Sequence, residues 1–140
     1  MTEYQTRELE RLYRLAVKLQ ANPAGTVAPC EGGCGRIGRD AHHVVKRSQE
    51  PGIRWKYEPR FGVWLCPVCH PIADQPGGAE IVIAKLRPWR PQRAKSLARY
   101  VALHDRLKCK PVSFPWMRSY LKRCIQRLEA SWSESYCEGA

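Results

Sequence analysis

The sequence lacks a long apolar run and an apolar leader, and it has few acidic residues. Its 140 residues hold 13 Asp and Glu against 24 Lys and Arg. No apolar stretch approaches the roughly 20 residues that a membrane-spanning helix requires, and residues 1–7 lack the apolar core of a signal peptide. We therefore expect a cytoplasmic protein with no membrane partner. The hydrophobic fraction of 44% is that of a folded globular domain.

The excess of basic residues is concentrated in the C-terminal part of the chain. The formal net charge is +11, and residues 77–140 alone carry thirteen basic and five acidic side chains, net +8. A field of this sign attracts polyanions, and nucleic acid is the commonest polyanion of the cytosol. The charge therefore favours a DNA partner, although a basic surface kept only for solubility would have the same composition.

Seven cysteines are many for a cytosolic chain of this length, and an odd number cannot all pair in disulfides. Four of them form two closely spaced pairs, Cys30 with Cys34 and Cys66 with Cys69. A tight turn containing glycine lets two thiolates of one loop reach the same ion, and Zn²⁺ binds four such ligands tetrahedrally. The spacing predicts one structural zinc ion. The alternative is a set of unrelated buried cysteines.

Hydrophobic periodicity predicts one compact α+β domain made of three segments. Residues 1–25 hold an amphipathic helix, in which Thr2 and Gln5 occupy the positions of a capping box. Residues 26–78 contain the closely spaced Cys, His, Gly and Pro residues, and residues 79–140 form a basic helical extension.

The expected elements follow from the same patterns. Helices are predicted over 2–20, 79–86, 92–108 and a segment after Ser113. Strands are predicted over 41–45 and 62–65. A further helical turn after the second strand is expected to be short, because Pro71 interrupts it.

Four side chains form a candidate catalytic site. His42 and His43 are adjacent in the first predicted strand, so they point to opposite faces. His70 and Asp74 are four residues apart, the spacing that places two ligands on one helical face. A divalent ion bound by His42, His70 and Asp74 would keep open positions for phosphate and water. His43 is then the candidate general base, because imidazole titrates near the working pH. Taken singly, each of these side chains is also compatible with a structural role.

Residues 28–76 resemble the HNH endonuclease family. The resemblance rests on the first cysteine pair, on residues 41–45 (AHHVV) and on residues 65–70 (LCPVCH). The dipeptide Arg54-Trp55 followed by residues 62–66 looks like the phage-type branch, which includes phage recombination endonucleases. The resemblance implies a ββα-metal core, DNA as the substrate, and a bacterial or phage-infected host cytosol.

The resemblance also implies the role of each site residue. By resemblance, His42 and His70 bind the catalytic metal, and His43 activates water. Asp74 stands where relatives often carry a second histidine. The catalytic ion is expected to be Mg²⁺ or Mn²⁺, with Zn²⁺ as an alternative.

At one position the sequence departs from the family pattern. The family usually has an asparagine just before the second strand, which steadies the loop and the catalytic histidine. The matching residue here is Phe61, whose ring cannot make those hydrogen bonds. Either a neighbour such as Glu58 or Arg60 substitutes, or activity is reduced or lost.

Basic side chains near the site and in the extension are candidate phosphate contacts. These DNA-binding candidates are Lys46, Arg47, Arg54, Arg93, Arg99, Arg118 and Lys122.

The sequence therefore predicts a metal-dependent DNA endonuclease that hydrolyses phosphodiester bonds with a histidine general base. The first alternative is a zinc-stapled DNA-binding module that has lost catalysis through Phe61. The second alternative is a helical platform that docks a protein partner.

Overall fold

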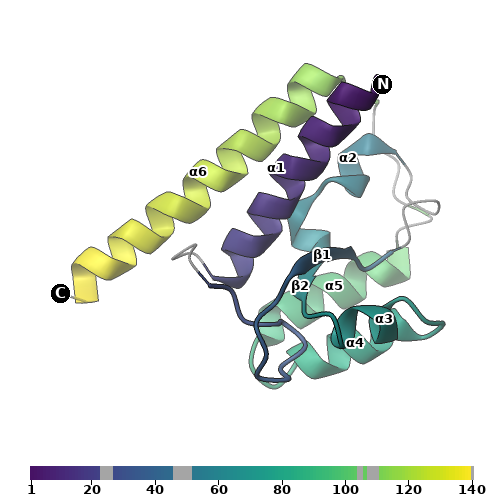
Figure 1. The fold of residues 1–140 in the computed structure, drawn as a ribbon, viewed down its shortest axis with the longest axis vertical. Coiled ribbons are helices and arrows are strands. Elements are labelled where there is room, and N and C mark those ends of the chain that lie inside the picture. The colour runs from purple at the N-terminus through teal and green to yellow at the C-terminus, as the bar shows by residue number, and fades with distance from the viewer. Residues whose placement is uncertain (23–26, 46–51, 104–105, 107–110, 140) are drawn as a thin grey trace.

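The computed structural model describes residues 1–22, 27–45, 52–103, 106 and 111–139, and only the backbone of 132–139. These residues form six α-helices, a short 3-10 helix and one two-stranded antiparallel sheet (Figure 1). The α+β class predicted from the sequence is confirmed. No helix in the described ranges combines the length and the apolar composition that a membrane crossing requires.

The first and last helices lie side by side and begin at the same end of the molecule (Figure 1). Helix α1 spans Glu3–Ala21, and the predicted capping box between Thr2 and Gln5 is present at its start. Helix α6 spans Phe114–Gly139. Apolar residues of both helices form one core, which includes Leu9, Leu12, Ala16, Met117 and Leu121. The N-terminal segment and the extension are therefore joined by a shared core.

The two strands pair in antiparallel register. Strand β1 spans Asp40–His43 and strand β2 spans Gly62–Leu65. His42 pairs with Val63, and His43 pairs with Gly62. The second strand has the predicted bounds, whereas the first starts and ends earlier than the predicted 41–45.

Strand β2 is buried on both of its faces. Trp64 points into the core made by α1 and α6. Val63 and Leu65 point the other way, into a second core with helices α4 (Gly78–Leu86) and α5 (Pro91–Leu103). Because alternate side chains of one strand enter two cores, β2 connects the two halves of the fold.

Three short elements surround the sheet. Helix α2 spans Ile53–Lys56, the 3-10 helix η2 spans Pro59–Phe61, and helix α3 spans Cys69–Ala73. The shortness of α3 agrees with the effect expected of Pro71. Neither α2 nor η2 was predicted, because a single helical turn has no periodicity to detect.

Two buried glutamates fasten these elements. Glu31 is fully buried and accepts hydrogen bonds from the backbone N–H of Trp64 at 3.0 Å and from Arg93 Nε at 2.8 Å. Glu58 is 1% exposed and accepts hydrogen bonds from Arg54 Nη1 at 2.7 Å and from Tyr120 Oη at 2.6 Å. Each carboxylate therefore has the charged partners that burial requires.

Candidate functional site

Four cysteines from two separate loops converge beside the sheet. The Sγ atoms of Cys30, Cys34, Cys66 and Cys69 all lie within 4.8 Å of one another. Cys34 is the most exposed of the four. The predicted meeting of the two cysteine pairs is confirmed, and the cluster is compatible with a structural metal such as zinc. Four sulfur donors are a set that Zn²⁺ binds tetrahedrally.

The first cysteine loop is closed by its own backbone. The N–H of Cys30 donates to the carbonyl of Arg36 at 2.9 Å. Gly33 and Gly35 have φ angles of +70° and +80°, which favour glycine. A Cβ added to Gly32 would lie 3.1 Å from the Sγ of Cys69. The glycines of this loop therefore permit both the tight turn and the close approach of the second loop.

Backbone N–H groups point at two of the sulfurs. The N–H groups of Gly32 and Cys66 donate to Cys30 Sγ at 3.4 and 3.3 Å. Burial nevertheless raises the pKa of Cys30 to about 12. Burial also acts against ionisation of Cys66, but N–H donors of Cys69 and Val68 outweigh it and lower the pKa of Cys66 to about 6. A cation bound at the centre would offset the cost of ionising the buried thiols.

His42, His70 and Asp74 form a second cluster. One ligand atom from each lies within 4.8 Å of the others. His42 Nδ1 is 3.2 Å from Asp74 Oδ1, and His70 Nε2 is 3.6 Å from Asp74 Oδ2. The structure thus brings together the three residues predicted as ligands of the catalytic ion.

The local folds of β1 and α3 account for this meeting. His42 lies on β1, which contacts α3 directly. His70 lies in the first turn of α3, and Asp74 caps its end, where its N–H donates to the carbonyl of His70 at 3.1 Å. One helical turn therefore places both side chains over the same strand, as their spacing predicted.

His42 is buried, with a side chain only 6% exposed. Burial lowers its pKa to about 4, against the opposing effect of the Asp74 carboxylate. The ring is therefore neutral at pH 7 and can offer a lone pair to an ion. Its Nε2 is buried and accepts or donates no hydrogen bond within the described part of the chain.

His43 lies on the opposite face of β1 from His42, as alternation predicted. Its ring stacks on that of Tyr13 from α1, with centroids 4.6 Å apart and planes 19° apart. Gly62 faces His43 across the sheet, and a Cβ added there would collide with the hydroxyl of Tyr13. His42, His43 and Asp74 nevertheless line one pocket of about 280 Å³.

The ring of Phe61 packs against two other aromatic side chains. It stacks on Tyr100 of α5 with centroids 3.7 Å apart and planes 2° apart, and Trp55 lies 5.6 Å away. Glu58 and Arg60 are the two neighbours proposed to replace the asparagine that supports the catalytic histidine. They are paired with each other, and Arg54 and Tyr120 also donate to Glu58. Neither residue is therefore free to support His43. The loop before β2 is thus held by aromatic contacts.

Two residues of the site were not identified from the sequence. Asp40 Oδ2 lies 3.9 Å from His70 Nδ1, on the same face of β1 as His42. The alternation of the strand was a signal for this placement. Tyr13 comes from a helix that is distant in sequence, and no local pattern links it to His43.

The predicted phosphate contacts lie in different surroundings. Arg99 and Lys122 are exposed, and Arg118 Nε is 3.4 Å from Glu8 Oε1. Lys46 and Arg47 lie outside the described residues.

Arg93 and Arg54, two further residues predicted to contact phosphate, are engaged inside the fold. The Arg93 side chain is 15% exposed and donates to Glu31 and to the carbonyl of Gly62 at 2.6 Å. The Arg54 side chain is 16% exposed, pairs with Glu58 and lies over the Tyr120 ring at 4.4 Å. Each of these two guanidinium groups therefore has partners within the protein, and their predicted phosphate contacts stay a prediction.

No family model, no curated protein and no solved structure matches this chain.

Proposed function

We propose that this protein is a metal-dependent DNA endonuclease of the HNH type, with His43 as the general base. The observation that carries the proposal is the convergence of His42, His70 and Asp74 within 4.8 Å, on a pocket that His43 also lines. Two imidazoles and one carboxylate form an incomplete ligand set for a divalent ion, which is the arrangement that hydrolytic metal sites use.

The residues present fit such an ion. His42 Nδ1 and His70 Nε2 lie 3.2 and 3.6 Å from the two oxygens of the Asp74 carboxylate, and imidazole nitrogen and carboxylate oxygen are both ligands of divalent ions. Mg²⁺ or Mn²⁺ held by the three side chains would act as a Lewis acid on the phosphate. The four-cysteine cluster is proposed to hold a separate structural zinc ion.

The remaining chemistry belongs to the protein side chains. His43 accepts a proton from water as the oxygen attacks phosphorus, and the bond from phosphorus to the 3′ oxygen breaks. The departing 3′ oxygen takes a proton from solvent. Tyr13 holds the His43 ring by stacking, so the base does not have to be oriented by the reacting groups.

Two further features support the proposal. Strand β1 pairs with β2, and β2 is followed directly by α3, so the sheet and the helix after it have the strand, strand, helix order that the HNH resemblance implies, with α2 and η2 inserted between the strands. The formal charge of +11 favours a polyanionic substrate.

A cleavage assay on plasmid and branched DNA, run with Mg²⁺, Mn²⁺ and Zn²⁺ in turn, tests the proposal. We expect His43→Ala to lower the cleavage rate by roughly 10²–10⁴-fold, the usual contribution of a positioned base, with DNA affinity unchanged. His42→Ala serves as the contrast: its rate should recover partly in excess metal ion, because a lost ligand weakens ion binding. If the His43→Ala protein cleaves DNA at the wild-type rate, His43 is not the general base and the proposed mechanism is wrong.

A second candidate function is a zinc-stapled DNA-binding module without catalysis. The stacking of Phe61 on Tyr100 favours it, because no amide from that position supports His43. Such a module would bind duplex DNA with a strong dependence on salt. It would cut neither plasmid nor branched DNA with any of the three ions.

A further inference from the structure

A groove of about 1050 Å³ runs between α1, the loop before β1, and β1 itself. Four basic residues of α1 line it, and we call them the α1 basic stripe: Arg7, Arg11, Arg14 and Lys18. Their spacings of four, three and four residues put them on one face of the helix. The buried residues of α1 occupy the other side of the helix.

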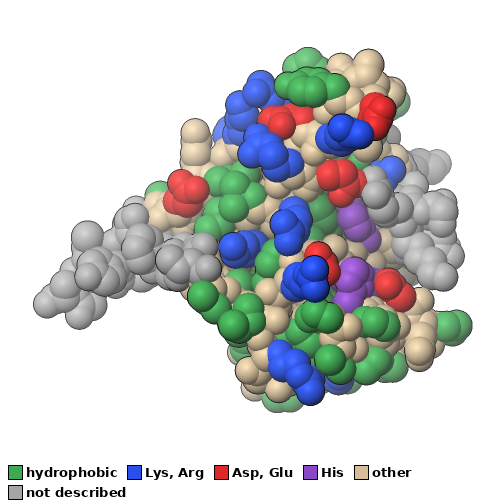
Figure 2. Space-filling view, in the orientation of Figure 1, with side chains coloured by type: hydrophobic (Ala, Val, Ile, Leu, Met, Phe, Trp, Pro, Cys, Tyr) green, Lys and Arg blue, Asp and Glu red, His purple; other side chains and the backbone are tan. Residues whose placement is uncertain are grey.

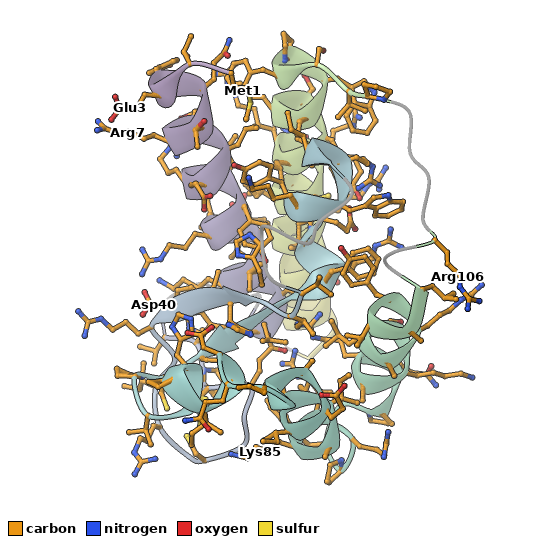
Figure 3. All side chains as sticks on the ribbon, turned by 90° about the vertical axis from the view of Figure 1, so that its right-hand side faces the viewer. Met1, Glu3, Arg7, Asp40, Lys85 and Arg106 are labelled. Carbon is orange, nitrogen blue, oxygen red and sulfur yellow. The ribbon has the colours of Figure 1, made fainter. Side chains whose placement is uncertain are left out.

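The stripe leads to the candidate metal site. Arg14 Nη2 donates to the carbonyl of Arg39 at 2.6 Å and lies 3.9 Å from Asp40 Oδ1. Asp40 lies 3.9 Å from His70, which also lines the groove. In Figure 3, Arg7 and Asp40 project from the same side of the molecule. On the face shown in Figure 2, Lys and Arg side chains lie near histidines, with Asp and Glu side chains among them.

We propose that this groove receives the sugar-phosphate backbone of DNA and guides it to the His42, His70 and Asp74 cluster. The inference rests on the proposed function, because it takes DNA as the substrate. From Arg7 to Lys18 the helix rises about 16 Å. This length corresponds to about five base pairs along the axis of a duplex at about 3.4 Å each, so the stripe can meet more than one phosphate at once.

The acidic neighbours of the stripe do not block it. Arg7 pairs with Glu3, and both side chains are 78% exposed. An exposed pair of this kind contributes little and exchanges readily, so Arg7 can turn to a phosphate. The Arg11 side chain is 62% exposed, and its partner Glu8, which is 13% exposed, keeps a second cationic partner in Arg118 when Arg11 turns away.

The basic extension is the competing surface for DNA. Among the described residues that line the groove, none comes from 77–140. Arg93 and Arg90 of that segment donate to the buried Glu31. Some of the basic side chains of the extension therefore pair with a buried carboxylate, whereas the basic side chains of α1 remain at the surface.

An acidic protein segment is the competing occupant. Ile37 and Val27 line the groove and are 64% and 53% exposed, so the groove also offers apolar contacts. Phosphate is favoured because the cations recur along the helix and lead to the groups that would bind a divalent ion.

The test compares two double variants of the zinc-loaded full chain. Arg11→Gln with Lys18→Gln removes two of the four charges of the stripe, and Arg123→Gln with Arg127→Gln removes the same charge from exposed positions of α6. Binding of a labelled 25-base-pair duplex is measured by fluorescence anisotropy between 50 and 200 mM salt. We expect the stripe variant to bind at least tenfold more weakly, with a salt slope smaller by about 2, since each phosphate contact contributes about 0.9. The α6 variant should remain close to wild type.

The outcomes separate this inference from the proposed function. If wild type binds DNA and the stripe variant binds equally well, the groove assignment is overturned while the nuclease proposal stands. If wild type binds no DNA at 50 mM salt, the proposed function fails and the groove assignment falls with it. If the stripe variant loses binding of a labelled polyglutamate peptide but keeps its DNA affinity, the groove belongs to an acidic protein segment.

Discussion

The imidazole ring of His43 and the phenol ring of Tyr13 stack with their centroids 4.6 Å apart. Tyr13 is 1% exposed and packs edge-on against Tyr57, which is fully buried. The second histidine of β1 is therefore fixed by a buried aromatic residue of α1, whereas Phe61 turns to Tyr100.

The effect of replacing Tyr13 on the cleavage rate should depend on whether the new side chain keeps an aromatic ring. Tyr13→Phe keeps the stack and should keep most of the cleavage rate. Tyr13→Leu removes it, and we expect kcat to fall by about 10²-fold with little change in KM, because a displaced base acts on the chemical step. Steady-state cleavage kinetics on a short duplex provide both values.

Tyr57→Leu is the matched control for Tyr13→Leu. It removes a buried ring of the same size that contacts Tyr13 but is not stacked on His43. Both leucine variants should lose about 2–4 kcal/mol of unfolding free energy. An equal loss of kcat in the two variants would show that Tyr13 acts only through stability.

Phe61→Asn tests whether the missing amide limits activity. We expect the variant to be less stable by about 2 kcal/mol, because it loses the stack on Tyr100 and the contact with Trp55. The cleavage rate should not increase, since Tyr13 already holds His43. A variant that cuts DNA beside a wild type that does not would favour the binding-module function.

Metal removal should unfold the protein. Structural zinc can contribute on the order of 10 kcal/mol, which is comparable to the stability of a whole domain. We expect one zinc ion per chain by elemental analysis, and loss of the folded circular dichroism spectrum on chelation or in Cys66→Ser. Cys124→Ser is the control, because Cys124 lies on α6 outside the cluster. Folded wild type without zinc would contradict this.

Tyr120 should make stability fall at alkaline pH. Burial, together with the Glu58 carboxylate to which its hydroxyl donates, raises the pKa of Tyr120 well above the usual value of about 10. Above pH 10 the unfolded chain ionises this tyrosine while the folded chain does not, so its contribution is complete below pH 10 and is lost as pH rises.

Tyr120→Phe isolates that contribution. At pH 8 the variant should be less stable by about 1–2 kcal/mol, because Glu58 loses one hydrogen bond. Between pH 10 and 11.5 its unfolding free energy, measured in urea, should fall less steeply than that of wild type. Parallel slopes would contradict the assignment.

The sequence predicted those features of the fold and site that depend on short spacings. The capping box of Thr2 and Gln5, the cysteine pairs, and the turn that carries His70 and Asp74 are all encoded within a few residues. In such cases the local backbone geometry alone fixes which atoms meet.

Contacts between distant segments could not be predicted in this way. The charge of Arg93 is visible in the sequence, but its hydrogen bond to Glu31, 62 residues away, is not. The stacking of Tyr13 on His43 likewise depends on how α1 docks against the sheet. Tertiary packing determines which distant side chains meet, and the composition of the sequence does not show that packing.

Because the alternate side chains of β2 enter two separate cores, the middle of the chain is not a detachable module. A fragment covering residues 26–78 would leave Trp64 without α1 and α6, and Val63 and Leu65 without α4 and α5. Truncation from either end should therefore abolish the folding of what remains. The cysteine cluster and the histidine cluster can therefore be transferred to another protein only together with the surrounding helices.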